Sequence, residues 1–150
     1  MRLFVYTITL LLYFGLLISC GTSKKAIENA PNVELVQPPN GKAVVYLIRP
    51  SMLGQLINTK VEIDGQYVGK TKGKQYLYTV LDPGTHTITS IAENTSEVPI
   101  ELEAGKQYFF EQEIKMGVLK ARNELVRIEE KDARIKLQKC KLSKEFMTEL

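Results

Sequence analysis

The chain has 150 residues, of which 44% are hydrophobic and 25% are charged, and this length and balance suit one globular domain. It carries 20 Lys and Arg residues against 17 Asp and Glu residues, a formal net charge of +3. Such a small excess, without clustered basic residues, is no nucleic-acid footprint, so we expect no nucleic-acid partner. The chain has two cysteines, which is too few for a disulfide framework.

The N-terminus has the pattern of a bacterial signal peptide. Arg2 precedes a nearly continuous apolar run from Leu3 to Ile18, which is short for a membrane-spanning helix and suits a signal-peptide core. The run ends in Leu17-Ile18-Ser19-Cys20, which resembles the lipobox of bacterial lipoproteins. The resemblance implies that residues 1–19 are removed and that lipid on the Cys20 thiol anchors the mature chain to a membrane.

Two alternatives for this segment stay open, namely a soluble secreted protein and an uncleaved anchor in which Cys20 is incidental. Gly21, in place of an acidic residue after Cys20, resembles the sorting pattern of outer-membrane lipoproteins and implies an anchor that faces the periplasm. Residues 20–41 are small, polar and proline-rich, and we interpret them as the lipidated N-terminus and a flexible tether. A second interpretation makes Val33 to Val36 an edge strand.

Residues 42–142 are predicted to be the folded domain. Apolar or alternating runs separated by turn signals indicate eight strands, at 43–48, 61–63, 66–70, 75–81, 85–92, 97–103, 106–115 and 124–128. The clearest turn signals are Asp64-Gly65 and Asp82-Pro83-Gly84, whose residue types suit turns that need positive φ.

The last part of the domain changes period. Apolar residues over 129–142 recur at helical spacing, which predicts a helix with Cys140 on its inward face. Residues 143–150 are interpreted as a frayed tail. The predicted fold class is therefore a mostly β protein, an antiparallel β-sandwich with a C-terminal α-helix.

Two resemblances support this fold. Ile63 to Gly69 (IDGQYVG), followed by Leu81 to His86 (LDPGTH), resembles PEGA-type surface-layer modules, which implies a prealbumin-like or carboxypeptidase-regulatory-like sandwich. Gly41 to Leu142 is similar to a family of bacterial lipoproteins known as domain of unknown function 2846, through GKAVVYLIRP, VEIDGQYVG, LDPGTHT and LEAGKQYFF. That resemblance implies the fold and a lipid-anchored location, and it implies no activity because the family has none assigned.

No stretch of the sequence has the pattern of a catalytic or metal-binding site, so we expect no enzyme, no cofactor and no metal. His86 is the one histidine and lacks a His or Cys cluster, so we expect it to hydrogen-bond around the Pro83-Gly84 turn. Asp64 and Asp82 could be the carboxylate pair of a glycosidase, but turn chemistry already accounts for both. Five glutamates of the late strands form either a weak calcium site or, as we prefer, a solvated face: Glu97, Glu101, Glu103, Glu111 and Glu113.

Tyr67, Tyr76 and Tyr78 are the candidate binding surface. Hairpin neighbours would bring these rings within cross-strand reach, and tyrosine offers both a flat face and a polar tip. Core packing is the other explanation for the rings. The functional hypothesis is a lipid-anchored, non-catalytic interaction module for another envelope protein or a glycan. The alternative is a structural spacer or self-assembling subunit that uses exposed sheet edges, and the oligomeric state stays open.

Overall fold

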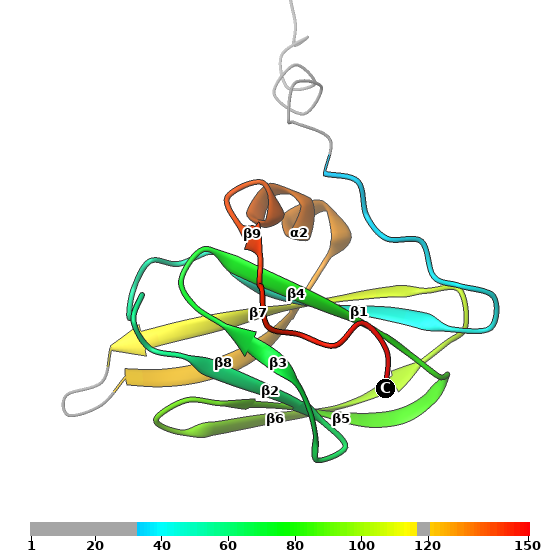
Figure 1. The fold of residues 1–150 in the computed structure, drawn as a ribbon, viewed down its shortest axis with the longest axis horizontal. Helices are drawn as coiled ribbons and strands as arrows, with labels where there is room; N and C mark the ends of the chain where they lie inside the picture. The colour runs from blue at the N-terminus through cyan, green and yellow to red at the C-terminus, as the bar shows by residue number, and fades with distance from the viewer. Residues whose placement is uncertain (1–32, 117–120) are drawn as a thin grey trace, which may run out of the picture. The chain divides into compact units, whose positions relative to one another are not determined.

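Figure 1 shows the fold in a computed structural model, which describes residues 33–116 and 121–150. The predicted signal peptide, Cys20 and the first part of the predicted tether lie outside the described residues. All eight predicted strands are present, and a ninth strand follows the helix. Their bounds are β1 (Ala43–Arg49), β2 (Thr59–Ile63), β3 (Gln66–Thr71), β4 (Gln75–Leu81), β5 (Gly84–Ile91), β6 (Thr95–Leu102), β7 (Gln107–Met116), β8 (Ala121–Ile128), α2 (Glu130–Leu137) and β9 (Lys141–Leu142).

The strands form two sheets that pack as a β-sandwich, so the predicted fold class is confirmed (Figure 1). One sheet has the order β8-β7-β1-β4-β9 and the other has the order β3-β2-β5-β6. Most neighbours are antiparallel, but β1 pairs with β7 in parallel, and β4 pairs with β9 in parallel. Pro99 lies in β6 at the edge of the second sheet, as its missing N–H predicts.

The turns that the sequence predicts have the expected backbone. Asp64 and Gly65 join β2 to β3 with φ of 53° and 79°, which is the pair of positive angles that a type I′ turn needs. Gly84 has a φ of 133°, in the region that favours glycine. Asp64 N–H donates to the carbonyl oxygen of Thr87 at 3.0 Å, which places the β2–β3 turn beside the first half of β5.

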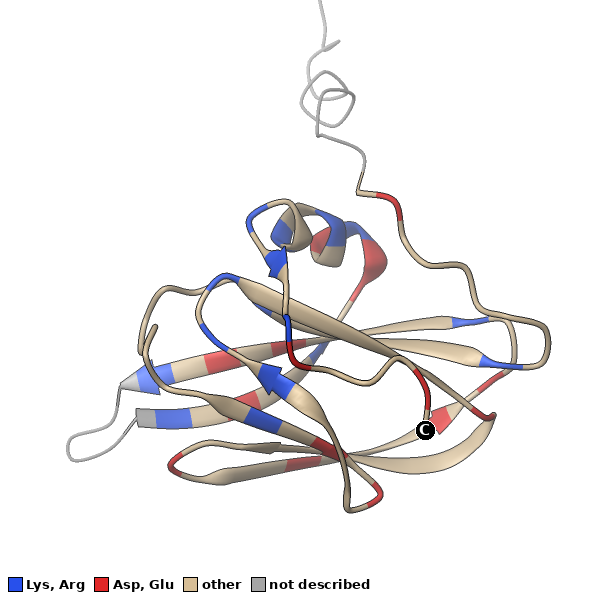
Figure 2. Cartoon of the chain, in the orientation of Figure 1, with Lys and Arg blue, Asp and Glu red and all other residues tan. Residues whose placement is uncertain are grey.

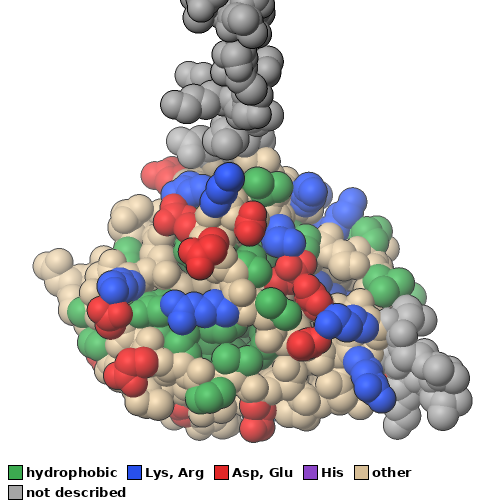
Figure 3. All heavy atoms as spheres, turned by 180° about the vertical axis from the view of Figure 1, so that it is seen from behind, with side chains coloured by type: hydrophobic (Ala, Val, Ile, Leu, Met, Phe, Trp, Pro, Cys, Tyr) green, Lys and Arg blue, Asp and Glu red, His purple; other side chains and the backbone are tan. Residues whose placement is uncertain are grey.

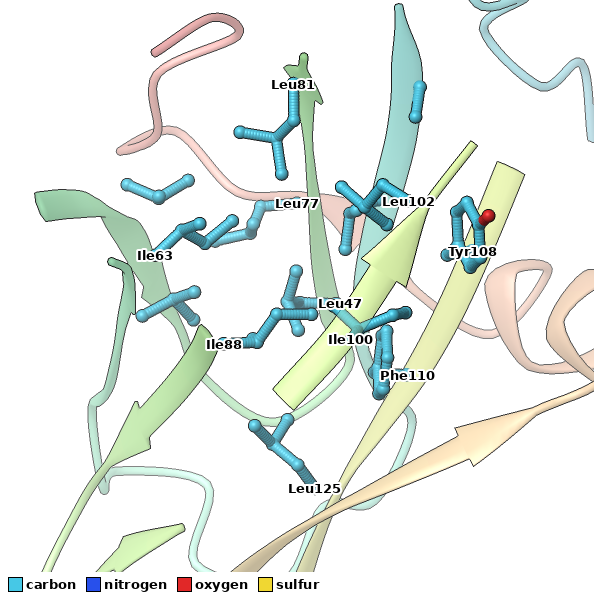
Figure 4. Packing of buried hydrophobic residues seen from close by; sticks show 14 residues of the cluster. Leu47, Ile63, Leu77, Leu81, Ile88, Ile100, Leu102, Tyr108, Phe110 and Leu125 are labelled. Carbon is cyan, nitrogen blue, oxygen red and sulfur yellow. The ribbon is translucent and has the colours of Figure 1, made fainter. Parts of the chain in front are cut away.

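The main core lies between the two sheets. Figure 4 shows its side chains pointing toward one another from both sheets, among them Leu47, Leu77 and Ile88. Each of these three side chains has no exposed surface. Burying a leucine or isoleucine side chain stabilises a fold by about 2 kcal/mol, so this layer supplies a large share of the folding free energy.

A second apolar cluster covers the outer face of the five-stranded sheet. Every residue of β1 is buried, which confirms the prediction of a strand that is covered on both faces. Its alternate residues Val44, Tyr46 and Ile48 point away from the main core and pack with Ala133 and Leu137 of α2. The helix therefore lies over this sheet as a third layer (Figure 1).

The helix ends earlier than the sequence predicts. Helical spacing extends to residue 142, but α2 ends at Leu137 and Lys141–Leu142 form β9. Strand β9 pairs with Gln75 and Tyr76 at the free edge of β4. Unpaired backbone groups at a sheet edge are costly to leave without partners, and this outweighs the weak helical preference of two residues. Cys140 packs against the second cluster, as predicted.

The C-terminal residues differ from the frayed tail that the sequence predicts for 143–150. Lys70 N–H donates to Glu145 O at 3.0 Å, and Met147 N–H donates to Val68 O at 2.7 Å. Val80 N–H donates to Thr148 O at 2.7 Å. Strands β3 and β4 are consecutive in the chain but belong to different sheets, so both leave a free edge on the same side of the sandwich. The C-terminal segment hydrogen-bonds to both edges, and Phe146 packs against the core between them.

The end of the predicted tether is likewise packed against the domain. Residues 33–39 form no strand, so the edge-strand interpretation does not hold for them. Leu35 is 4% exposed within the second cluster, and Val36 N–H donates to Tyr46 Oη at 2.7 Å. Arg134 of α2 donates to Val33 O at 3.1 Å. Residues 33–36 of the predicted tether are therefore packed against the folded domain.

This arrangement predicts that the C-terminal segment contributes to stability. Phe146→Ala removes part of a core side chain, and we expect it to lower the free energy of unfolding by about 2 kcal/mol, below the 3–5 kcal/mol typical of a fully buried Phe. The neighbouring variant Met147→Ala is the control: Met147 is 42% exposed, so we expect a change within about 0.5 kcal/mol. Urea unfolding of both variants measures this, and equal small losses would mean that the segment is a loose tail.

Candidate functional site

The three candidate tyrosines do not form one surface. Tyr67 lies on β3 in the four-stranded sheet, whereas Tyr76 and Tyr78 lie on β4 in the five-stranded sheet. Strands β3 and β4 do not pair, so the cross-strand contact that we expected between these rings is absent from the described structure. Tyr67 is 40% exposed, and its ring centroid lies 5.6 Å from Lys60 Nζ. It is the one tyrosine of the three with a largely open face.

Tyr76 and Tyr78 belong to the second apolar cluster. The rings of Tyr78 and Tyr46 lie 5.7 Å apart, and Tyr46 stacks on Phe109 at 5.2 Å. The ring of Phe146 lies 5.3 Å from that of Tyr78 and covers its other side. Burial raises the pKa of Tyr46 to about 12, although its hydrogen bond with Val36 acts in the opposite direction. These rings pack as a covered layer, so core packing explains them better than a binding role.

His86 lies between two turns, as the sequence predicts. Its Nδ1 atom is 2.6 Å from Asp64 Oδ2, and its Nε2 atom is 3.0 Å from the carbonyl oxygen of Asp82. Asp64 Oδ1 also accepts the Thr87 N–H at 2.8 Å. Both oxygens of Asp64 and both ring nitrogens of His86 are thus used to hold the β2–β3 turn against the β4–β5 turn.

The carboxyl group of Asp64 has a lowered pKa. Partial burial acts to raise it, but the hydrogen bonds with Thr87 N–H and His86 and the charge of His86 outweigh burial. Asp82 instead pairs with Lys42 at 2.7 Å on the surface. The two carboxylates therefore serve separate contacts, and the geometry gives no support to a glycosidase pair.

Cys140 is a half-buried thiol. Burial, and to a smaller extent the charge of Glu111, raise the pKa of this thiol to about 11. The charges of Lys74 and Lys139 act in the opposite direction. A thiol with a raised pKa is protonated at neutral pH and is a poor nucleophile. The partial burial matches the inward-facing Cys140 that the sequence predicts.

The late-strand glutamates are divided among separate partners. Glu101 accepts the Thr85 hydroxyl at 2.6 Å, Glu103 pairs with Lys106 at 2.7 Å, and Glu111 pairs with Lys136 at 2.9 Å. Figure 3 shows acidic and basic side chains interspersed over the face seen from behind. Within residues 33–116 and 121–150, no group of three His, Cys, Asp or Glu side chains is placed to hold a metal ion.

A buried polar network crosses the sandwich at the end away from His86. Thr71 donates to Gln112 Oε1 at 2.5 Å, and Gln112 Nε2 donates to Ser90 Oγ at 3.0 Å. Ser90 Oγ donates to Asn123 Oδ1 at 2.9 Å, and Asn123 N–H donates to Asn94 Oδ1 at 2.6 Å. The network links four strands from both sheets. Buried polar groups that are fully paired in this way fix the relative position of the elements that carry them.

A polar groove opens directly outside this network. Its volume is about 350 Å³, and it is lined by Asn94, Thr95, Ser96, Lys115, Arg122, Asn123 and Glu124. Lys115 Nζ pairs with Glu124 at 2.5 Å and with Glu113 at 3.4 Å. Arg122 makes no ion pair with any described residue. The groove thus offers hydrogen-bond donors and acceptors and a guanidinium without an ion-pair partner among the described residues, on strands that the network keeps in place.

The groove was not predicted from the sequence, although the strand parity of the residues beneath it carries a signal. Gln112 has the same strand parity as Phe110 and Ile114, and Asn123 has the same parity as Leu125. Polar residues at positions whose neighbours face the core indicate a paired buried network. That pattern identifies the network, and the packing of the two sheets on each other then brings the lining residues together.

Comparisons with known proteins give a family and one relative. Residues 39–124 match the model of a family described as "Protein of unknown function (DUF2846)". An "Uncharacterized protein" of Haemophilus influenzae is 26% identical over 131 residues, which cover 85% of this chain and 78% of that protein. Neither match supplies an activity. The likeness to PEGA-type modules stays a prediction.

The contacts of Asp64 predict how stability depends on pH. Because its folded pKa lies below the unfolded value of about 3.9, the carboxylate stabilises the fold above that pH and loses this effect as the pH falls through its folded pKa. Asp64→Asn keeps a residue that tolerates positive φ. We expect the wild type to be more stable than this variant at pH 6, and the difference to shrink below about pH 4.

Urea unfolding between pH 2.5 and pH 7 measures this difference. Asp82→Asn is the matched control, because the Asp82 side chain is 68% exposed in its ion pair and exposed pairs contribute little. A difference between wild type and Asp64→Asn that is constant over the whole pH range would contradict the account.

Proposed function

The chain belongs to the family described as "Protein of unknown function (DUF2846)", and from this premise we propose that it is a lipid-anchored envelope protein whose folded domain binds another envelope protein without catalysis. The polar groove is the proposed binding site. The single observation that carries the proposal is the groove itself: unlike the packed rings of Tyr76 and Tyr78, it is an open site, and a paired, buried network fixes its lining.

Structural roles of the candidate reactive residues support a non-catalytic protein. His86 and Asp64 join two turns, and Cys140 has a pKa of about 11. An active site needs a nucleophile or base that is free to act and has a pKa near the working pH. These residues are the ones that sequence reasoning selects for chemistry, and each is used to hold the fold.

The lining of the groove favours a protein partner over a glycan. Pockets for small ligands are lined mainly by apolar and aromatic side chains with a few polar groups. The groove is lined by polar and charged side chains, with no aromatic ring among them. Charged and amide groups of this kind complement the polar segments of a partner protein and set its orientation. A glycan is the competing ligand, and the crosslinking experiment below separates the two.

The alternative of assembly through sheet edges has less support. The free edge of β3 is occupied by residues 145–147, and the free edge of β4 is occupied by β9. At the edge of β8, Asn123 N–H and Leu125 N–H donate to side chains of Asn94 and Ser96. Strand β6 carries Pro99, which lacks a donor. Among the described strands, β6 and the two-residue β9 keep an outer edge without a neighbouring strand.

The location of the protein follows from Cys20 in this proposal. We place the lipid on Cys20 and the anchor in the outer membrane, with the domain facing the periplasm. Support comes from the sequence resemblance to the lipobox and from Gly21 at the following position. In the part of the chain that the structure describes, no helix is long and apolar enough to cross a membrane.

Replacing the proposed lipidation site tests the anchor. Cys20→Ser removes the thiol that would carry the lipid. Each buried CH₂ of a lipid chain adds about 0.8 kcal/mol to membrane binding, so the variant loses the acyl chains that stable anchoring needs. We expect the wild type in the membrane fraction and the signal-cleaved variant in the soluble fraction. Cys140→Ser is the matched control, because it also removes one thiol and should leave the fractionation unchanged. A cleaved Cys20→Ser chain that stays in the membrane would refute the anchor.

Photocrosslinking in intact cells tests the groove. A photoreactive phenylalanine analogue replaces Thr95, which is exposed in the groove, or Thr85, which is exposed at the other end of the β5–β6 hairpin. We expect a discrete protein adduct from position 95, at least tenfold less from position 85, and loss of the adduct when Arg122→Glu is added. Equal adducts from both positions, or a glycan adduct at position 95, would contradict a protein-binding groove.

A further inference from the structure

Lysines and exposed apolar side chains gather where the β1–β2 loop, the β3–β4 turn and β9 meet. We name this surface the basic corner, and its residues are Met52, Leu53, Leu56, Lys72, Lys74, Lys139, Lys141 and Leu142. Lys141 N–H donates to Lys74 O at 2.9 Å, which joins β9 to the β3–β4 turn. A Cβ atom on Gly73 would lie 2.9 Å from Ser51 O, so the β1–β2 loop is in close contact with the same turn.

Three apolar side chains of the basic corner are exposed to solvent on a loop that hydrogen bonds hold in place. Leu56 is 89% exposed, Met52 is 45% exposed and Leu53 is 43% exposed. Arg49 is fully buried beneath this loop, and its guanidinium donates to Ile57 O at 2.7 Å and to Gly54 O at 2.6 Å. The loss of these carbonyl partners would leave a buried charge without hydrogen bonds, which is strongly unfavourable. The loop is therefore pinned while its leucines face outward.

The lysines of the basic corner are unpaired. Elsewhere lysines have acidic partners, for example Lys42 with Asp82, Lys70 with Glu145 and Lys136 with Glu111. Among the described residues, none of the four lysines of the basic corner makes an ion pair. Figure 2 shows basic residues at the β3–β4 turn, at β9 and in the segment before β9, on one side of the domain. Their charges repel one another, so an anionic partner would be bound favourably.

We propose that the basic corner rests on an anionic phospholipid surface. Lysines attract acidic headgroups, while leucine and methionine enter the boundary between headgroups and acyl chains. The long apolar stems of the lysines let their charged ends stay at headgroup level while neighbouring leucines go deeper. A protruding loop with apolar side chains beside unpaired lysines meets both requirements of a bilayer. An acidic protein would account for the lysines and would leave Leu56 exposed.

This surface is separate from the polar groove and goes beyond the proposed partner binding. It depends on the proposed anchor only in that the anchor keeps a bilayer within reach. Contact at the basic corner would fix which way the domain faces, because a lipid anchor alone leaves the domain free to rotate about its attachment. The polar groove is lined by residues of the β5–β6 turn, β6, β7 and β8, none of which belongs to the basic corner.

Depth-dependent fluorescence quenching tests this proposal, since the natural chain has no tryptophan. Leu56→Trp is introduced into the full chain, which is purified and reconstituted into vesicles containing brominated lipids. We expect emission from this variant to fall by at least half in vesicles with 30% phosphatidylglycerol, and to fall by less than a tenth in pure phosphatidylcholine. Thr85→Trp, on an exposed position beyond the opposite end of β4, is the matched control and should not be quenched in either lipid.

Reversing the charge of two lysines of the basic corner is a second test of the proposal. Lys72→Glu with Lys74→Glu should abolish quenching in the Leu56→Trp chain, whereas Lys42→Glu with Lys106→Glu changes the net charge equally and should not. Absence of quenching at position 56 in anionic vesicles overturns the proposal and leaves the corner to an acidic protein. Equal quenching in both lipids, or at positions 56 and 85 alike, also overturns it.

Mass spectrometry of the purified chain reports lipidation of Cys20 separately, so failure of the anchor and failure of this contact are distinguished.

Discussion

Both faces of β1 are buried, so the five-stranded sheet that contains it must be covered by other elements on each of its two faces. Ala43, Val45 and Leu47 pack between the sheets, while Val44 and Tyr46 enter the second cluster. The four-stranded sheet covers the first face, and α2 with residues 33–36 covers the second. The four-stranded sheet needs no such cover, because its outer face carries polar and charged side chains. Segments outside the strands are thus as necessary to the fold as the strands.

The same constraint determines which residues are available for function. The tyrosines of β4 lie on the face that α2 and Phe146 cover, so their rings stabilise the domain. Asp64 of the β2–β3 turn and His86 of β5 hold that turn against the β4–β5 connection at one end of the sandwich. Open surfaces remain where strands end: the polar groove at the β5–β6 turn and the adjoining ends of β7 and β8, and the basic corner beside β9. Both proposals use surfaces that the fold positions and does not itself need to cover.

Most strands could be predicted from the sequence, because their alternation and turn residues are local signals. Asp64-Gly65 and Gly84 have the positive φ that their residue types suggest, and Pro99 lies at an edge. Three features depend on distant partners and had no local signal: the parallel pairing of β1 with β7, the packing of Leu35, and the hydrogen bonds of residues 145–148 to β3 and β4. The lining of the groove also depends on distant partners, since the packing of one sheet on the other brings Asn94 and Arg122 together, although the buried polar residues beneath the groove have a local signal in their strand parity.

The central claim is that the segments before β1 and after β9 belong to one cooperative unit with β1. Native-state hydrogen exchange of backbone amides as a function of urea tests it most directly, because it gives an opening free energy for each amide. The Val36, Met147 and Leu47 amides should open with the same free energy and the same urea dependence, since the first two donate to Tyr46 Oη and Val68 O. Opening of the Val36 or Met147 amides at a much lower free energy than the Leu47 amide would contradict the account.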